Sequence, residues 1–279
     1  MTTPRKREKL SVVVLTRNEA DIIVRCLESV GWADEVIVID DNSADGTAGI
    51  AKEYADKVIV HPLDNNFSDQ RNFGTGCASG DWILQMDADE RVTEALRGKI
   101  EAVLAGGSKM AAFRFRRSNN FCGKFLTAGG EDRHRPLRLF RRGRARFSGG
   151  RIHEELAVDG PVGEIDAVME HYNFPDISHY VATQDFYCGL EAVSLQESAG
   201  LLPKKKLRRE LTIGPVKLFF KIYMKKRAYK DGMHGLVFAI LSAWRRFLIY
   251  AKYWEANQEK YRDKYEFRNP DSETISKSE

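Results

Sequence analysis

The first ninety residues alternate between short apolar runs and amphipathic segments, and this alternation constrains the fold more than any other feature. Apolar runs at 10–15, 35–39, 57–60 and 82–86 predict strands, and the segments at 22–30, 45–54 and 68–78 predict helices. Strands that alternate with helices of about 11 residues pair in parallel, with helices on both faces of the sheet. The sequence therefore predicts an α/β fold with a mainly parallel, Rossmann-like sheet.

Polar residues gather where the predicted strands end. Because ligands of parallel sheets bind at the carboxyl ends of the strands, we expect a binding crevice there. The G-x-G-x-x-G and G-x-x-x-x-G-K-[ST] patterns are both missing, which argues against a usual dinucleotide fold and against a P-loop enzyme. The strand-end residues are Thr16, Asn18 and Glu19 after the first strand, Asp40 and Asp41 after the second, and Asp87 and Asp89 after the fourth.

Asp87 and Asp89 lie two residues apart at the end of a predicted buried strand. Side chains at this spacing in an extended segment point to the same side, and two carboxylates placed in this way repel each other unless a positive charge lies beside them. A divalent cation would supply that charge, and oxygen ligands suit Mg²⁺ or Mn²⁺. The pair therefore predicts a metal site that could bridge a diphosphate, and the alternative is a solvated turn.

Other strand-end groups suit the remainder of a nucleotide. A carboxylate such as Asp40 or Asp41 can accept hydrogen bonds from a base N–H or from ribose hydroxyls. Arg71, on the third predicted helix, could make a bidentate contact with phosphate or with a base carbonyl. The alternatives are strand-end capping for Thr16 and Asn18 and a surface ion pair for Arg71.

Four motifs resemble those of the family 2 glycosyltransferases with the GT-A fold. They are residues 12–19 (VVVLTRNE), 38–47 (VIDDNSADGT), 71–72 (RN) and 80–90 (GDWILQMDADE), which occur in order and in register over about the first 100 residues. Residues 136–140 (PLRLF), residues 152–154 (IHE) and the C-terminal region resemble the bacterial subgroup that adds glucose to the lipopolysaccharide inner core.

This resemblance implies roles for individual residues. Asp41 would contact the nucleotide base, with Asp40 as a neighbouring candidate, and Asp89 would be the stronger ligand of the Mg²⁺ or Mn²⁺ ion. The full implied set is Thr16, Asn18, Glu19, Asp40, Asp41, Arg71 and Asp87 for the nucleotide sugar, and Asp87, Asp89 and either His153 or His171 for the metal.

Inverting members of this family need a carboxylate that removes the proton of the acceptor hydroxyl, and such general-base help is worth ~10²–10⁴ in rate. Glu131 and Asp132 follow a pair of glycines, in a pattern close to the family's x-Glu-Asp. We assign Asp132 as the base and Glu131 as the second candidate. The alternative is a loop carboxylate that pairs with nearby arginines.

Charge is local rather than global in this chain. The formal net charge of the 279 residues is only +4, but the segment 133–151 contains eight arginines and no acid. Arginine suits phosphate and carboxylate groups, which an acceptor such as lipopolysaccharide core carries, although some of these arginines would be solvated. Aromatic patterns of RNA- and DNA-binding domains are absent, so we expect no nucleic-acid partner.

The C-terminal region combines basic and apolar residues. Between 203 and 230 there are eleven basic residues, interleaved with aromatics, against one acid. The apolar run at 235–244 is shorter than the ~20 residues that span a bilayer, and the combination suits a helix in the membrane interface. The alternative is packing on the catalytic domain or on a second subunit. We predict a catalytic domain at 1–200 and a helical, membrane-associated region at 201–279.

These observations predict a metal-dependent, inverting transferase that moves a hexose, with glucose favoured, from a UDP-sugar to a cell-envelope glycan or a lipid-linked acceptor. The widely spaced cysteines and the absence of a signal peptide or anchor favour the cytoplasmic face of the inner membrane. The oligomeric state is left open. The alternatives are a non-catalytic glycan- or membrane-binding protein on the same fold and an Asp-x-Asp phosphotransferase.

Overall fold

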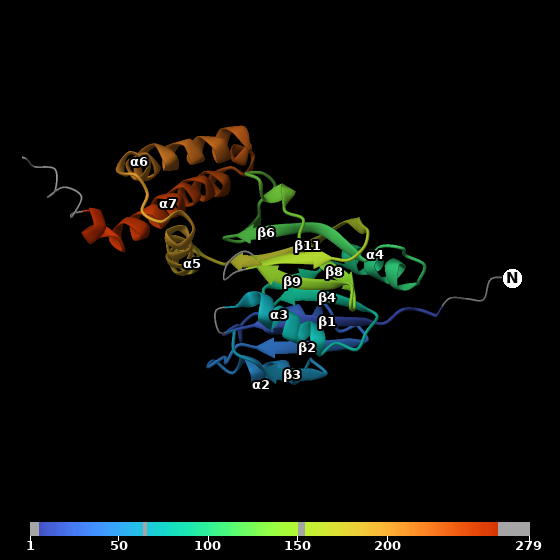
Figure 1. The fold of residues 1–279 in the computed structure, drawn as a ribbon. Coiled ribbons are helices and arrows are strands. Elements are labelled where there is room, and N and C mark those ends of the chain that lie inside the picture. Colours follow the sequence, from blue (N-terminus) through green and yellow to red (C-terminus); the bar gives the residue numbers. More distant parts are fainter. Residues whose placement is uncertain (1–5, 64–65, 150–153, 262–279) are drawn as a thin grey trace, which may run out of the picture.

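The computed structural model describes residues 6–63, 66–149 and 154–261. A nine-stranded sheet runs through the molecule in the order β3-β2-β1-β4-β8-β6-β11-β5, with β7 beside β6. Three long helices lie together beyond one side of this sheet (Figure 1). The predicted α/β fold, with helices on both faces and a helical C-terminal region, is confirmed.

The parallel half of the sheet consists of the four strands expected from the N-terminal sequence. They are β1 (Leu10–Thr16), β2 (Glu35–Asp40), β3 (Lys57–Val60) and β4 (Trp82–Asp87). β1 pairs in parallel with both β2 and β4, and β2 pairs in parallel with β3. All carboxyl ends of these strands therefore meet at one edge, as predicted.

The connecting helices α1 (Ile23–Glu28), α2 (Thr47–Ala51) and α3 (Phe67–Gly76) lie where the periodicity places them, but α1 and α2 are short. After α1 the chain changes to tighter bonds three residues apart, from Ser29 N–H to Cys26 O and from Val30 N–H to Leu27 O. Val30 is still fully buried. The apolar spacing therefore reports burial correctly and overestimates the length of the helix.

Alternate residues of the strands face two different hydrophobic layers. Val12 and Val14 face α1, α2 and α4 (Glu94–Leu104), whose apolar side chains form one core. Val13 and Leu15 face the other layer, which contains α3 and the hairpin of β9 (Ala145–Gly149) and β10 (Glu154–Val158). Both faces are covered, which explains why β1 is apolar throughout instead of alternating.

The second half of the sheet is mixed. β8 (Leu137–Arg141) pairs antiparallel with both β4 and β6 (Ala112–Phe121). β11 (Val162–Phe174) runs parallel to β6 and antiparallel to β5 (Glu90–Val92), and β7 (Lys124–Phe125) pairs with β6. β4 is therefore the strand at which the parallel half meets the antiparallel strands.

The C-terminal helices are α5 (Ile177–Ala199), α6 (Lys204–Phe220) and α7 (Met233–Glu255). α7 lies against both α5 and α6 (Figure 1). Between α6 and α7 the chain forms a π-helical turn, η2 (Lys221–Lys225), and a 3₁₀ turn, η3 (Ala228–Asp231). Among the described residues, no helix is both long enough and apolar enough to span a bilayer.

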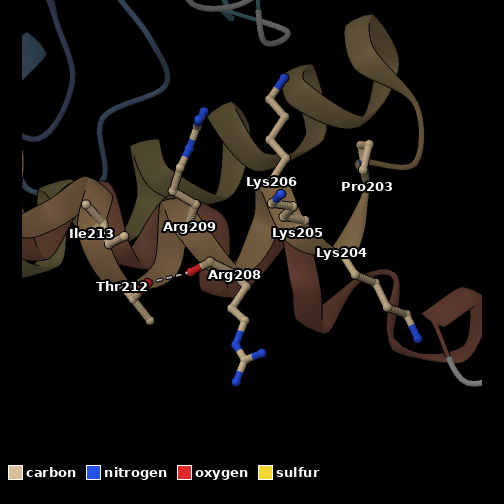
Figure 2. Close-up of a pocket in the computed structure, with 8 residues that line it drawn as sticks. All are labelled: Pro203, Lys204, Lys205, Lys206, Arg208, Arg209, Thr212 and Ile213. Atoms are coloured by element: carbon tan, nitrogen blue, oxygen red, sulfur yellow. Dashed lines mark hydrogen bonds between the residues drawn. The ribbon is translucent and has the colours of Figure 1, made fainter.

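The first turns of α6 carry a cluster of basic side chains around a surface hollow. Lys206 and Arg209 project to one side of the helix, and Lys204 and Arg208 project to the other (Figure 2). Among the described residues, this hollow is lined by Pro203, Lys204, Lys205, Lys206, Arg208, Arg209, Thr212 and Ile213. No acid is among them, so this part of α6 presents a strongly positive surface.

Gly74 allows α3 to lie directly on the sheet. A Cβ atom at Gly74 would be 2.6 Å from Val13 Cγ1 and 2.9 Å from Ile39 Cγ1, whereas one at Gly76 would meet nothing within 4 Å. We expect Gly74→Ala to lower the free energy of unfolding by ~1–3 kcal/mol through overpacking. The matched control Gly76→Ala should stay within ~1 kcal/mol of the wild type or exceed it. Urea unfolding of both variants measures this, and equal stabilities would contradict the close approach.

Candidate active site at the strand ends

The ends of β1 and β2 bring two buried oxygen atoms together. Thr16 and Asp40 are paired in the parallel register and are 6% and 1% exposed. Asp40 Oδ2 accepts a hydrogen bond from Ser43 N–H at 2.9 Å, but Asp40 Oδ1 and Thr16 Oγ1 have no hydrogen-bond partner among the described residues. Because buried polar atoms normally have partners, these two oxygens mark a place where a donor group of a ligand would be stabilised.

Asp41 is already engaged on both carboxylate oxygens. Arg17 Nη1 lies 2.9 Å from Oδ2, and Leu63 N–H donates to Oδ1 at 2.7 Å. The Asp41 N–H donates to Thr16 O at 2.9 Å. Asp41 therefore joins the loop after β3 to the end of β1, and Asp40 is the acid that has an oxygen left for a ligand.

Asn18 connects the loops that follow β1 and β2. Its backbone is left-handed, with φ at 54°, and its Oδ1 accepts from Ala44 N–H at 2.8 Å. Its N–H donates to Ser43 Oγ at 2.9 Å. The next residue, Glu19, donates its N–H to Thr47 Oγ1 at 2.9 Å. Asn18 therefore joins the two strand-end loops through its backbone and its side chain, and the Thr47 hydroxyl adds a further bond between them.

The Glu19 side chain occupies an acidic environment. Burial, followed by the charges of Asp89, Asp21, Asp45 and Asp87, raises the pKa of Glu19 from 4.5 to about 8. A carboxyl group in such surroundings stays protonated near neutral pH unless a positive charge is added. Burial is the larger cause, and the four nearby acids add to it, so several carboxylates gather in the space beside Asp89.

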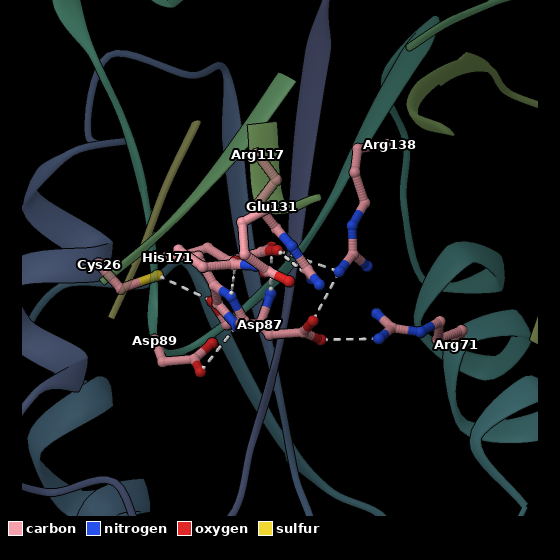
Figure 3. Close-up of polar contacts among 10 residues, drawn as sticks. Cys26, Arg71, Asp87, Asp89, Arg117, Glu131, Arg138 and His171 are labelled. Atoms are coloured by element: carbon pink, nitrogen blue, oxygen red, sulfur yellow. Dashed lines mark hydrogen bonds and ion pairs between the residues drawn. The ribbon is translucent and has the colours of Figure 1, made fainter. Parts of the chain in front are cut away.

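Asp87 lies between two arginines. Arg71 Nη2, from α3, is 2.7 Å from Oδ1, and Arg138 Nη2, from β8, is 2.6 Å from Oδ2 (Figure 3). Burial alone would raise the pKa of Asp87, but Arg138 and Arg71 outweigh burial and hold this pKa well below its usual range. The positive charge beside Asp87 in the protein therefore comes from arginine, and Arg71 is buried here instead of forming a surface ion pair.

Glu90 extends this charge cluster and was not anticipated from the sequence. It is fully buried, its Oε1 lies 3.1 Å from Arg138 Nη2 and 3.2 Å from Arg117 Nη1, and its Oε2 accepts the Asp87 N–H at 3.0 Å. Glu90 directly follows the Asp-Ala-Asp motif, and Arg138 lies in the segment 136–140. The spacing of these two segments along the chain gives no sign that the side chains of Glu90 and Arg138 meet.

Asp89 faces away from this cluster toward β11. His171 Nε2 lies 3.0 Å from Asp89 Oδ2, and His171 Nδ1 lies 2.7 Å from Asn119 Oδ1 (Figure 3). The Asn119 amide nitrogen in turn donates to Glu131 Oε2. Because a carboxylate only accepts hydrogen bonds, Glu131 orients the Asn119 amide so that its oxygen faces the histidine.

The donors around Asp89 fit a divalent cation. Asp89 Oδ1 is buried and has no hydrogen-bond partner among the described residues. A tautomer that donates Nδ1–H to Asn119 Oδ1 would leave the lone pair of Nε2 for a metal, in the arrangement typical of ligating histidines. Within the described ranges, no group of three or more His, Cys, Asp and Glu side chains could hold a metal ion. Phosphate oxygens of a substrate would have to complete the coordination, as is usual for Mg²⁺.

The two base candidates lie at the start of a 3₁₀ turn, η1 (Glu131–Arg133). The Glu131 carboxylate is within the hydrogen-bonded series that ends at Asp89. The side chain of Asp132 lies outside the described part of the structure, and so does the whole of His153. Of the two histidines that the sequence leaves open, His171 is the one whose position the structure describes, and it lies beside Asp89.

Several arginines of the segment 133–151 are engaged within the protein. Arg135 pairs with Glu164 at 2.8 Å, and Arg144 pairs with Asp159 at 2.8 Å. Arg141 pairs with Glu8 at 2.7 Å. The Arg141 pair reaches the segment before β1, and the Arg144 pair joins the two ends of the β9–β10 hairpin. The density of arginine in the sequence therefore overstates the positive charge that is available to an acceptor.

Comparison with known proteins places this site in a family. The family model described as glycosyl transferase family 2 matches residues 11–153, more than half of the chain. The lipopolysaccharide core biosynthesis glycosyltransferase LpsC of Rhizobium meliloti is 26% identical over 260 residues, which are 91% of this chain and 94% of LpsC. An uncharacterized glycosyltransferase of Rickettsia felis is 29% identical, over 89% of this chain and 90% of its own length.

Solved structures show a looser likeness. S. aureus TarS 1–349 in complex with UDP-GlcNAc has a TM-score of 0.46 and 16% identity, and the match covers 92% of each chain. The mannosyltransferase PcManGT from Pyrobaculum calidifontis, in complex with GDP-Man and Mn²⁺, has a TM-score of 0.45 and 15% identity. That match covers 92% of this chain and 76% of PcManGT.

The environment of Glu19 predicts a dependence of stability on pH. Because its pKa is raised from 4.5 to about 8 on folding, the unfolded chain binds fewer protons between these pH values, and the wild type loses stability as pH rises through this window. We expect Glu19→Gln to remove this loss. Urea unfolding with a chelator present should show the variant gaining on the wild type from pH 5 to pH 8. The exposed Glu28, changed to Gln, is the control, and a Glu19→Gln difference that is constant with pH would contradict the prediction.

Proposed function

This chain belongs to glycosyl transferase family 2 and is a glycosyltransferase, and on that premise we propose an inverting, metal-dependent transfer of a hexose from a UDP-sugar to a cell-envelope glycan or lipid-linked acceptor. The observation that supports this most is Asp89, which shares one oxygen with His171 and has a second, buried oxygen without a partner. Glucose is the sugar favoured by the inner-core resemblance of the segments at 136–140 and 152–154.

The nucleotide would occupy the ends of β1 and β2. Asp40 Oδ1 and Thr16 Oγ1 are the unpartnered oxygens there, and they suit the N–H of a base or the hydroxyls of a ribose. Asp41, Asn18 and Glu19 would line this pocket from the loops that they hold. Arg71, which pairs with Asp87, would lie between the nucleotide pocket and the metal site.

Asp89 and His171 would hold Mg²⁺ or Mn²⁺, with Asp87 fixing the end of β4 from which the turn that carries Asp89 begins. A divalent cation, when bound, offsets the negative charge of the departing diphosphate. Arg138 and Arg117 add positive charge behind Asp87 and Glu90, so the cluster of three arginines and two acids has a net positive charge. The departing diphosphate would therefore leave into a region of favourable potential.

Asp132 remains our candidate for the base that removes the acceptor proton, since the carboxylate of its neighbour Glu131 is engaged with Asn119. Membership of the family argues against the two alternatives. A phosphotransferase would need a nucleophilic Asp after the first strand, where this chain has Thr16. The relative LpsC, named for lipopolysaccharide core biosynthesis, supports a core-type acceptor.

Membrane attachment is the proposed role of α6. An exposed apolar row follows one side of α6 and continues into η2, with residues three or four apart: Ile213, Val216, Phe220 and Met224, each between 50% and 57% exposed. Lys206 and Arg209 continue the same row toward the start of the helix. Anionic lipid matches this pattern, whereas two copies of so basic a face would repel each other. The enzyme would then work at the cytoplasmic face of the inner membrane.

The metal assignment predicts the behaviour of an Asp89→Asn variant. We expect the wild type to release UDP from a UDP-hexose with Mg²⁺ or Mn²⁺, and the variant to lose at least ~10² in turnover, because charge stabilisation by a metal is worth several kcal/mol. Calorimetry with UDP should also show that Mn²⁺ no longer strengthens binding in the variant. Asp81→Asn, at the opposite end of β4, is the control, and an unchanged Mn²⁺ effect in Asp89→Asn would overturn the assignment.

The proposed membrane face predicts binding to anionic vesicles. Flotation with vesicles that contain phosphatidylglycerol should carry the protein, and salt should weaken this binding without abolishing it, because burial of the apolar row is not screened. Changing Lys205, Lys206 and Lys217 to Glu should reduce flotation at low salt, with each lost charge worth ~1 kcal/mol.

The control for this experiment is the same charge change on the catalytic domain, at the exposed residues Lys52, Lys99 and Lys109. That variant should float as the wild type does, and both should keep the same release of UDP from a soluble UDP-sugar. Equal loss of flotation in both variants would show that net charge matters and that the α6 face does not.

A further inference from the structure

The turn between α6 and α7 contains a buried carboxylate that binds the loop before the base candidates. Asp231 is 2% exposed. One of its oxygens accepts the Thr127 hydroxyl at 2.7 Å, and its carboxylate also accepts the N–H groups of Thr127, at 3.1 Å, and Ala128, at 3.0 Å. Three donors are enough to stabilise a carboxylate away from water. Asp231 is therefore the anchor of residues 127–128.

The same turn holds the following glycines. Gly129 N–H donates to Lys226 O at 2.9 Å. Gly129 and Gly130 have φ values of 76° and 103°, which favour glycine, and a Cβ on Gly130 would collide with the Lys226 side chain. Lys124 Nζ also donates to Asp231 O at 2.8 Å. The segment 226–231 thus contacts every residue of the loop from 127 to 130.

This loop leads directly to the candidate active site. Glu131 follows Gly130 and binds the Asn119 amide, which lies 2.7 Å from His171, and His171 lies 3.0 Å from Asp89. A displacement of the loop would therefore move both base candidates and the amide that orients the histidine. Misplacement of reacting groups by about 1 Å can cost 10²-fold in rate.

We propose that Asp231 is a positioning residue, through which the C-terminal region sets the place of the loop that carries Glu131 and Asp132. This rests on the proposed function, in which that loop supplies the base. The interactions described above for residues 226–231 include no contact with the ends of β1 and β2, where the nucleotide would bind. The proposal therefore predicts that a change at Asp231 lowers turnover and leaves nucleotide binding unchanged.

The test compares two isosteric changes of buried acids in the same helical region of the full-length protein. Asp231→Asn keeps the shape, but its amide N–H₂ cannot accept the loop's N–H groups. Glu210→Gln weakens the 2.5 Å contact with Arg246 between α6 and α7, without contact to the loop. We expect Asp231→Asn to lower kcat at least ~10-fold while the Kd for UDP stays within ~2-fold of the wild type. Glu210→Gln should keep kcat near the wild-type value at a similar loss of stability.

Two further variants grade the effect. Thr127→Ser keeps the hydroxyl and should retain kcat, whereas Thr127→Val loses one of the three donors and should fall between the wild type and Asp231→Asn. Hydrogen exchange should show faster exchange at 127–129 in Asp231→Asn, with no change at the ends of β1 and β2. Loss of UDP affinity in parallel with kcat, or an equal fall of kcat in Glu210→Gln, would show a general structural role and overturn the proposal.

The failure of this proposal and that of the proposed function are distinguishable. If Asp132→Asn or Glu131→Gln lowers kcat strongly while Asp231→Asn equals the wild type, the loop supplies the base but Asp231 does not position it. If Asp132→Asn and Glu131→Gln both keep full turnover, the base lies elsewhere and the proposed function is wrong in that assignment, which removes the premise of the positioning role.

Discussion

The double ion pair of Asp87 is the interaction on which the rest of the site depends. β4 and β8 share backbone register only from Trp82 to Leu84, so the last part of β4 is joined to β8 through side chains, by Arg138 to Asp87 and Glu90. Arg71 brings α3 to the same carboxylate. Glu90 and Arg138 are buried, and loss of either would leave an uncompensated buried charge, at a cost of ~3–5 kcal/mol. The cluster therefore fixes where β4 ends.

With the end of β4 fixed, the turn after it directs two neighbouring acids to different tasks. Asp87 is neutralised by arginine and contributes order, whereas Asp89 meets His171 and has an unpartnered oxygen. Glu19 lies partly buried among Asp89, Asp21, Asp45 and Asp87, and burial followed by these charges raises its pKa. Asp87, paired with arginines, and Asp89, beside His171, therefore contribute differently, and we propose that Asp89 is the acid that would meet a cation.

The C-terminal region has two different surfaces, and both reach the turn between α6 and α7. Its outer side, along α6, is basic with an exposed apolar row, and its inner side, at Lys226 and Asp231, is joined to the loop at 127–130. A surface that suits anionic lipid thus lies on the same segment that supports the proposed base loop. Attachment of the enzyme to a membrane and the order of that loop would then be linked, because one continuous segment of the chain makes both contacts.

The parallel half of the sheet and the identity of the strand-end residues could be predicted from the amino-acid sequence. Hydrophobic period and strand–helix alternation are local properties, so the four strands were predicted to within one residue at each end. Periodicity overestimated α1 and α2, because a tight turn can bury an apolar residue such as Val30 as well as a helix can.

Which side chains meet could not be predicted, because these contacts depend on long-range packing. Arg117 and Arg138 are far from Asp87 and Glu90 in the chain, and pairing of β4, β6 and β8 brings these side chains together. The choice of His171 beside Asp89, and the contact of Asp231 with Thr127 about a hundred residues away, also depend on long-range packing. Local patterns record burial and turn chemistry, but they contain no information on which distant segments share a strand edge.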